Sequence, residues 1–271
     1  MSLLERTKLL LRTHRISPNK LMGQNFMIDS SIFQSLVDYA TLDQNDVALD
    51  IGAGFGFLTQ FLAQRCKKVI AVEADGKLAS ILHEQFKGNS VIKIVQGNVL
   101  RTQIPEFNKI VAIPPYQISS HLVLWLFKQR FDCAVAIFQK EFAERLIAPV
   151  GSGSYGVLTV LTYFNSHCEL LDEVPKDRFY PQPKVDSAII RLQPKQPPFN
   201  MRNEEIFAKL VKSLFTQRNR KVRNAILPFL KGIIAMSPEK TAQIVSTLPF
   251  RDKRVRELAP EDFGALANAF A

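Results

Sequence analysis

The chain has 271 residues, 46% of them hydrophobic, so it can bury one large core together with a small appendage. Lysine and arginine outnumber aspartate and glutamate by 35 to 25, and the net charge of +10 favours a polyanionic partner, above all nucleic acid, over a merely basic enzyme. The three cysteines lie far apart without a C-x-x-C pair, which argues against a disulfide framework or a zinc site and fits a reducing cytosol. No apolar run is long enough to span a bilayer.

The first predicted element is a helix within residues 1–16, which are basic and amphipathic. Such a segment can face RNA, or it can be an organelle presequence. Glu5 and the absence of a serine-rich stretch count against a presequence. We therefore expect an N-terminal helix that faces RNA.

Short β-branched runs then alternate with helical runs. The predicted strands are 47–51, 69–72, 91–95, 110–113, 134–138, 168–173 and 187–192. Helical segments such as 57–66 and 77–86 separate the early strands, whereas no long helix separates the last two, which suggest an antiparallel pair closing the sheet. This alternation predicts an α/β fold, a Rossmann-like sheet of seven mostly parallel strands with helices on both faces.

A proline-rich stretch at 193–200 follows the last strand and reads as a linker, because proline neither continues a strand nor sits in a helix interior. Beyond it, 204–215 and several shorter runs have helical spacing. We expect two domains, a nucleotide-binding domain at 1–194 and a small helical domain at 195–271.

Residues 50–56 form a glycine-rich turn between the first strand and the following helix. The dinucleotide fingerprint would need a glycine three positions after Gly54, where the chain has Phe57, so a tight structural turn is the alternative. Glu73 ends the second strand, 21 positions after Gly52, where a carboxylate can accept both ribose hydroxyls or can simply be solvated.

The third strand ends at Gly97 and Asn98, where a short polar side chain could meet an adenine edge. A glycine turn, an acid and a polar residue at three successive strand ends are the usual arrangement for S-adenosylmethionine. Ligands of such sheets bind outside the carboxyl ends of the strands. We therefore expect S-adenosylmethionine as the cofactor.

Residues 113–116, Ile-Pro-Pro-Tyr, follow the fourth strand and resemble the N/D-x-P-Y/F/W motif of enzymes that methylate exocyclic amines. An adenine amine is a poor nucleophile because its lone pair is delocalised into the ring. Acceptors for its two hydrogens favour a pyramidal nitrogen, and an aromatic side chain can stack on the extruded base.

Several motifs, in order, resemble those of one known family. They are residues 23–29, which match G-Q-x-F-L-x-D; the glycine turn; Glu73; residues 115–119; residues 179–188, which match F-x-P-x-P-K-V-x-S-A; and the basic motif at 215–221. Over nearly its full length the chain resembles the KsgA family of small-subunit ribosomal RNA adenine dimethyltransferases. Residues 139–145 look closest to the archaeal branch.

The resemblance implies methylation of the exocyclic amine of adenine in small-subunit ribosomal RNA during ribosome biogenesis. The implied cofactor-binding residues are Gln24, Asn25, Met27, Gly52, Gly54, Glu73, Ala74, Asn98, Val99 and Ile113. The implied catalytic residues are Ile113, Pro114, Pro115, Tyr116 and Phe179. Glu73 would hold the ribose and Asn98 the cofactor's adenine. Tyr116 and Phe179 would stack on the two faces of the target base, although Phe179 could instead be a core aromatic.

Two positions depart from the family pattern. Most relatives have aspartate where this chain has Asn98, which still offers an oxygen acceptor. Relatives have asparagine where this chain has Ile113, which offers none, whereas Pro114 keeps its backbone carbonyl. We expect an enzyme that is slow, stops at one methyl group or is silent.

The candidates for RNA binding are Lys184, Arg218, Arg220, Lys221 and Arg223. The last four crowd one or two turns of helix, where guanidinium groups suit phosphate oxygens and a solvated face is the alternative. A looser basic cluster lies at 251–256. Because side chains read RNA loops better than RNA grooves, the expected target is an adenine in a loop or at a helix end.

Three functions compete at this point: an active small-subunit methyltransferase, a ribosome-assembly factor that transfers little or nothing, and a relative of the Erm-type enzymes or of the mitochondrial transcription factors. The C-terminal motif and the missing presequence argue against the third. We expect a cytoplasmic, monomeric protein without a metal.

Overall fold

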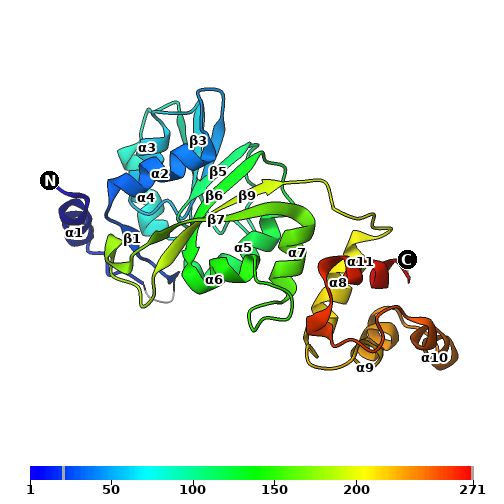
Figure 1. Cartoon of the computed structure of the whole chain (residues 1–271). Coiled ribbons are helices and arrows are strands. Elements are labelled where there is room, and N and C mark those ends of the chain that lie inside the picture. The colour runs from blue at the N-terminus through cyan, green and yellow to red at the C-terminus, as the bar shows by residue number, and fades with distance from the viewer. Residues whose placement is uncertain (20–21, 270–271) are drawn as a thin grey trace. The chain divides into compact units, whose positions relative to one another are not determined.

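The computed structural model describes residues 1–19 and 22–269, and the chain forms two compact units (Figure 1). The first unit comprises 1–143 and 167–194, and the second comprises 144–166 and the residues from 195 onward. Among the described residues no helix is both long and apolar enough to cross a membrane.

The first unit contains a seven-stranded sheet. Its strands are β2 (Val47–Ile51), β3 (Lys68–Glu73), β4 (Ile92–Gln96), β5 (Lys109–Ala112), β6 (Cys133–Gln139), β7 (Ser166–Val174) and β9 (Ser187–Pro194). Their order across the sheet is β4-β3-β2-β5-β6-β9-β7. β2 to β6 pair in parallel and β9 runs antiparallel to β6, which confirms the predicted mostly parallel sheet.

The strand positions follow from burial on both faces. Val69, Ile70 and Ala71 of β3, for example, are all at most 1% exposed, so neither face of the central strands meets water. Strands of this kind read in the sequence as continuous apolar runs rather than as alternating patterns. This is why the predicted central strands fall so close to the observed ones, and the edge strands β4 and β7, which are less buried, also lie within two residues of their predicted positions.

Six α-helices of the described chain begin in the first unit. They are α1 (Leu3–Thr13), α2 (Ser30–Ala40), α3 (Phe57–Leu62), α4 (Gly76–Gln85), α5 (Ser119–Leu126) and α6 (Lys140–Leu146). α2, α3 and α4 cover one face of the sheet and α5 and α6 lie on the other (Figure 1). Asp29 and Asp75 begin α2 and α4 by accepting hydrogen bonds from backbone N–H groups of the first turn.

The predicted N-terminal helix is present as α1, and a capping box between Ser2 and Glu5 begins it. Its apolar side, with Leu11 at 7% exposure, joins the cluster around Phe26 and Phe55. The helix is therefore fixed to the first unit by its apolar side and leaves its basic side to solvent.

A two-stranded antiparallel ribbon joins two distant motifs. It consists of β1 (Phe26–Met27) and β8 (Phe179–Tyr180), with Phe26 opposite Tyr180 and Met27 opposite Phe179. The ribbon fixes the N-terminal motif at 23–29 beside the motif at 179–188.

The second unit is helical. It contains α7 (Val157–Asn165), α8 (Glu204–Phe215), α9 (Val222–Ala225), α10 (Pro238–Thr247) and α11 (Pro260–Asn268). α7 precedes the expected linker but packs on α8 and α11, with the Phe164 and Phe207 rings 4.8 Å apart. The observed units therefore differ from the expected domains 1–194 and 195–271 over residues 144–166, because the apolar partners of α7 lie on the C-terminal helices.

A glycine-to-alanine pair tests the packing of the second unit. A Cβ at Gly264 would lie 2.4 Å from the Phe199 ring, which cannot move freely because it packs on Phe164 and Phe207. We expect Gly264→Ala to lower the free energy of unfolding by ~1–3 kcal/mol. Gly232→Ala, whose Cβ would meet nothing within 4 Å, is the control. Equal denaturant midpoints for the two variants would contradict this packing.

Candidate active site

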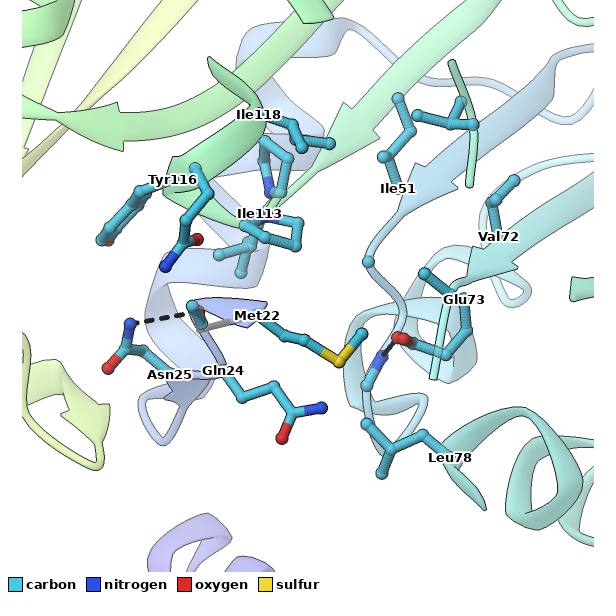
Figure 2. Close-up of a pocket in the computed structure, with 18 of the residues that line it drawn as sticks. Met22, Gln24, Asn25, Ile51, Val72, Glu73, Leu78, Ile113, Tyr116 and Ile118 are labelled. Carbon is cyan, nitrogen blue, oxygen red and sulfur yellow. Dashed lines mark hydrogen bonds between the residues drawn. The ribbon is translucent and has the colours of Figure 1, made fainter. Parts of the chain in front are cut away.

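A cavity of about 200 Å³ opens at the carboxyl ends of the parallel strands (Figure 2). Ile51, Glu73 and Asn98 line it from the ends of β2, β3 and β4, and Ile113 lines it from the end of β5. All the predicted catalytic and cofactor-binding residues except Met27 line this one cavity. Met27 is 5% exposed and belongs to the hydrophobic core, because successive side chains of a strand point to opposite sides and its neighbour Phe26 is the one that lines the cavity.

Glu73 is a buried acid, 7% exposed, at the end of β3. One carboxylate oxygen accepts the Gly54 N–H at 2.9 Å and the other accepts the Asp75 N–H at 2.9 Å. Burial raises the pKa of Glu73, while these backbone hydrogen bonds lower it. The carboxylate thereby connects the turn after β2 to the turn after β3.

A second acid, Asp50, lies deeper, at 1% exposure on β2. Its carboxylate accepts a hydrogen bond of 2.6 Å from the Thr59 hydroxyl of α3. Burial, opposed by the Thr59 hydroxyl and assisted by the nearby charge of Glu73, raises the pKa of Asp50 to about 7. Asp50 thus supports the glycine turn from beneath rather than facing the cavity.

The glycine turn requires glycine at Gly52. Its φ of +79° is a conformation that side chains rarely adopt, and a Cβ there would lie 2.9 Å from Pro115 and 3.5 Å from the Ile113 carbonyl oxygen. The turn after β2 and the loop after β5 therefore meet across the cavity floor with no room for a side chain.

Asn98 is exposed at the cavity edge. Its Oδ1 accepts the Leu100 N–H at 3.0 Å, an Asx turn that begins the segment after β4. The Asn98 oxygen that we expected to bind a ligand therefore accepts a backbone hydrogen bond instead. The Nδ2 group remains as a hydrogen-bond donor.

The loop after β5 carries the Ile-Pro-Pro-Tyr motif into the cavity. Ile113 packs partly against the main hydrophobic core, and Pro114 is buried. Among the residues of this motif the only oxygen acceptors are backbone carbonyls and the Tyr116 hydroxyl. The Tyr116 hydroxyl is already engaged with the Ser187 hydroxyl at 2.6 Å, and burial raises the pKa of Tyr116 to about 12.

The rings of Tyr116 and Phe179 contact each other directly. Their centroids are 6.4 Å apart and their planes form an angle of 72°, an edge-to-face pair, and Phe179 is only 2% exposed. The two rings are thus neighbours at the cavity, but a base stacked between them requires one of the rings to turn.

The N-terminal motif supplies the remaining wall. Gln24 donates to the Asp75 carboxylate at 2.9 Å, and Asn25 donates to the Gly23 carbonyl at 3.2 Å. The Met22 side chain extends across the cavity between Gln24 and Glu73 (Figure 2). Met22 was not among the predicted site residues, since a methionine in a loop carries no motif of its own.

Other lining residues were also missed as site residues. They are Gly23, Phe26, Ile51, Val72, Leu78, Gly97, Gln117 and Ile118. Most of them lie within or next to the motifs recognised in the sequence. Their proximity to those motifs could have identified them as site residues.

The basic cluster at 218–223 belongs to the second unit, and its helical placement was wrong. α8 ends at Phe215, and Lys221 has an extended backbone paired with Arg254, so Arg218, Arg220 and Lys221 precede α9 rather than share a helix. Thr216 ends α8 by donating its hydroxyl to the Ser213 carbonyl.

The side chains of this cluster have different surroundings. Arg218 donates to the carbonyls of Ser152 and Gly153, both at 2.9 Å, so its guanidinium supports a loop. Arg223 and Lys221 both pair with Asp252. Arg220 is exposed, and within 1–19 and 22–269 no ion pair engages it. Lys184 is exposed on the first unit, in the segment between β8 and β9.

Similarity to known proteins identifies the family of this chain. The family model described as ribosomal RNA adenine dimethylase matches residues 16–261. The chain belongs to this family. A relative from the archaeon Methanosarcina mazei, named probable ribosomal RNA small subunit methyltransferase A, is 40% identical over 253 residues, which cover 90% of each chain. This agrees with the expected archaeal-like branch.

Two solved structures of similar proteins share the fold over most of the chain. A dimethyladenosine transferase from Plasmodium falciparum has a TM-score of 0.77 at 28% identity, and covers 89% of this chain and 95% of its own. The 23S ribosomal RNA methyltransferase ErmE has a TM-score of 0.65 at 27% identity, and covers 91% and 99%. The chain is thus a class I methyltransferase fold of the ribosomal RNA adenine dimethylase family.

Within the part of the chain that the structure describes, no cluster of three histidine, cysteine, aspartate or glutamate side chains is placed to hold a metal ion. The two departures from the family pattern, Asn98 and Ile113, both line the cavity, so they bear on the ligands that it holds.

The raised pKa of Asp50 predicts a pH-dependent stability. The folded protein keeps a proton that the unfolded chain, with an ordinary pKa of 3.8, releases. The free energy of unfolding should therefore fall as the pH rises from about 4 to about 7. Asp50→Asn should make this decline in the free energy of unfolding, measured by urea titration, less steep. A smaller decline should remain, because the pKa of Glu73 is raised as well.

The matched control is Asp38→Asn on α2, because Asp38 is exposed. It should keep the wild-type slope of stability against pH. A wild-type slope in Asp50→Asn as well would show that Asp50 is ionised in the folded protein throughout this range.

Proposed function

We propose that this protein transfers methyl groups from S-adenosylmethionine to the exocyclic amine of adenine in small-subunit ribosomal RNA during ribosome assembly in the cytoplasm. The observation that carries this proposal is the single cavity in which the Glu73 turn and the Pro115–Tyr116 loop meet, in a chain of the ribosomal RNA adenine dimethylase family. The names of its relatives supply the substrate class.

The cavity fits S-adenosylmethionine on the evidence of its own residues. Glu73 is a buried carboxylate held at the strand end, and Gly52 lines the cavity with backbone alone. Glu73 accepts the ribose hydroxyls, Asn98 and Val99 border the adenine, and Gln24, Asn25, Gly54 and Ala74 enclose the rest. The bound cofactor supplies a methyl group on a positively charged sulfur.

The loop after β5 prepares the target amine. The Pro114 backbone carbonyl accepts one of the two amine hydrogens, which favours a nitrogen with a free lone pair facing the cofactor. Ile113 provides no side-chain acceptor for the second hydrogen. Pro115 keeps the loop rigid, and the reaction needs no metal in this arrangement.

The aromatic pair holds the base. Tyr116 stacks on one face of the extruded adenine and Phe179 covers the other once their direct contact opens. The hydrogen bond between Tyr116 and Ser187 fixes the Tyr116 ring while this happens. Arg220, Lys221 and Lys184 are the side chains best exposed for phosphate contacts, with Arg218 and Arg223 supporting their loop.

A second function, a ribosome-assembly factor that binds RNA and cofactor but transfers little, is favoured by one specific observation. Both departures from the family pattern, Ile113 and Asn98, lie in the same cavity. The two functions differ in the rate of methyl transfer and share the binding of RNA.

Two substitutions test the cofactor contacts in opposite directions. Glu73→Gln should weaken S-adenosylmethionine binding, because a charge-assisted hydrogen bond contributes ~1.5–3 kcal/mol. Asn98→Asp should tighten binding about tenfold, because an aspartate can accept the Leu100 N–H with one oxygen and a ligand hydrogen with the other. Isothermal titration calorimetry measures both.

Asn89→Asp is the matched control for the second change. Asn89 is exposed and its Oδ1 accepts the Val91 N–H at 2.9 Å, the same local geometry before β4 rather than after it. It should leave the affinity unchanged. Equal affinities for Asn98→Asp and wild type would remove Asn98 from the cofactor site.

The missing acceptor at Ile113 predicts a slow enzyme. Removing one preorganised hydrogen bond from a transition state typically costs ~10²–10³-fold in rate. Single-turnover methyl transfer to small-subunit RNA should be faster for Ile113→Asn than for wild type, by up to this factor, and Ile113→Ala should show no such gain.

The alanine control separates a new acceptor from relief of crowding. A fast wild type with no gain from asparagine would mean that another group supplies the acceptor. If wild type and Ile113→Asn both bind RNA and cofactor without transferring a methyl group, the assembly-factor function replaces the enzymatic one.

A further inference from the structure

The N-terminal helix α1 presents a basic surface beside the cavity. Lys8 and Arg12 lie one helical turn apart, and Arg15 follows the end of the helix, with its N–H bonded to the Arg12 carbonyl at 3.2 Å. All three side chains are exposed. We call Lys8, Arg12 and Arg15 the α1 basic face.

Among the residues that the structure describes, no acid forms an ion pair with this face. Residues 1–19 contain a single acid, Glu5, and its carboxylate accepts the Ser2 N–H in the capping box. Across residues 1–19 and 22–269, none of the three basic side chains takes part in an ion pair. An uncompensated cluster of this kind attracts polyanions.

The face is held rigidly on the first unit. Leu11 and Thr7 are buried on the adjoining side of the helix, and Leu10 and Ile16 pack against the cluster of Phe26. A basic amphipathic helix that buries its apolar side in its own core has no such side left for a lipid bilayer, which favours a nucleic-acid backbone as the partner.

Two links connect the α1 basic face to the cavity. Lys8 lies over the Tyr180 ring at 5.3 Å, and Tyr180 follows Phe179, which lines the cavity. Past the helix, the Asn19 N–H donates to the Gln24 side chain at 2.8 Å, and Gln24 lines the cavity as well. Figure 1 shows α1 beside the β1 ribbon.

We propose that the α1 basic face binds the phosphates that flank the target adenine, so that the first unit itself grips the RNA strand that enters the cavity. This inference rests on the proposed function. It adds a phosphate-binding surface separate from the cluster at 218–223 of the second unit.

The test is a charge-matched pair of triple variants of the full chain. Lys8→Gln, Arg12→Gln and Arg15→Gln together remove the α1 basic face. Lys67→Gln, Lys87→Gln and Lys93→Gln together remove the same charge from exposed lysines near the amino ends of β3 and β4, away from the cavity. Binding of transcribed small-subunit ribosomal RNA is measured against salt concentration.

We expect the α1 triple variant to bind RNA more weakly, with a log–log salt slope shallower by about two to three. Its KM for RNA should rise while kcat at saturating RNA and the affinity for S-adenosylmethionine stay unchanged. The control triple variant should keep the wild-type salt slope, since the slope reports phosphate contacts and its three lysines are not expected to contact the RNA.

Arg12→Gln alone, which keeps the contact of Lys8 with Tyr180, guards against a folding defect and should flatten the slope by about one. Equal slopes for the two triple variants, or a wild-type slope in the α1 variant, would overturn the inference and leave the proposed function standing. A wild type that neither binds nor methylates this RNA would overturn both.

Discussion

The buried carboxylate of Glu73 is the interaction on which the rest of the cavity depends. A charge at 7% exposure has to find hydrogen bonds within the protein, and it finds them at Gly54 and Asp75. Asp75 in turn accepts a hydrogen bond from Gln24. The ends of β2 and β3 and the N-terminal loop are therefore fixed relative to one another through two carboxylates, Glu73 and Asp75, before any ligand binds.

The sheet was predictable because its central strands are buried on both faces, so that β-branched runs such as that of β3 mark them directly. The cavity was predictable for the same reason. Glycine, acid and amide residues at the ends of parallel strands converge wherever the sheet is parallel. The family motifs then identified the loop at 113–116. Its motif is defined by residue type and order, which can be read directly from the sequence.

What the sequence could not predict are the partners of individual side chains. The Arg218 guanidinium donates to two carbonyls of a loop some 65 positions away, and no local pattern distinguishes that role from a phosphate contact. The sequence of α7 also does not indicate that Phe164 packs against Phe207. The two-residue strands β1 and β8 are too short for any periodicity, although they set the place of Phe179.

The contact between Tyr116 and Phe179 has a consequence for substrate selection. Under the proposed function the target base enters between these two rings, so separating them costs free energy that the entering base must supply. A free nucleoside or nucleotide offers only its small surface, whereas an adenine within a folded RNA brings binding energy from phosphates far from the reacting atom. Under the proposed function, the paired rings therefore disfavour free adenine nucleotides as methyl acceptors, and discrimination would lie as much in the resting position of these two side chains as in any hydrogen bond to the base.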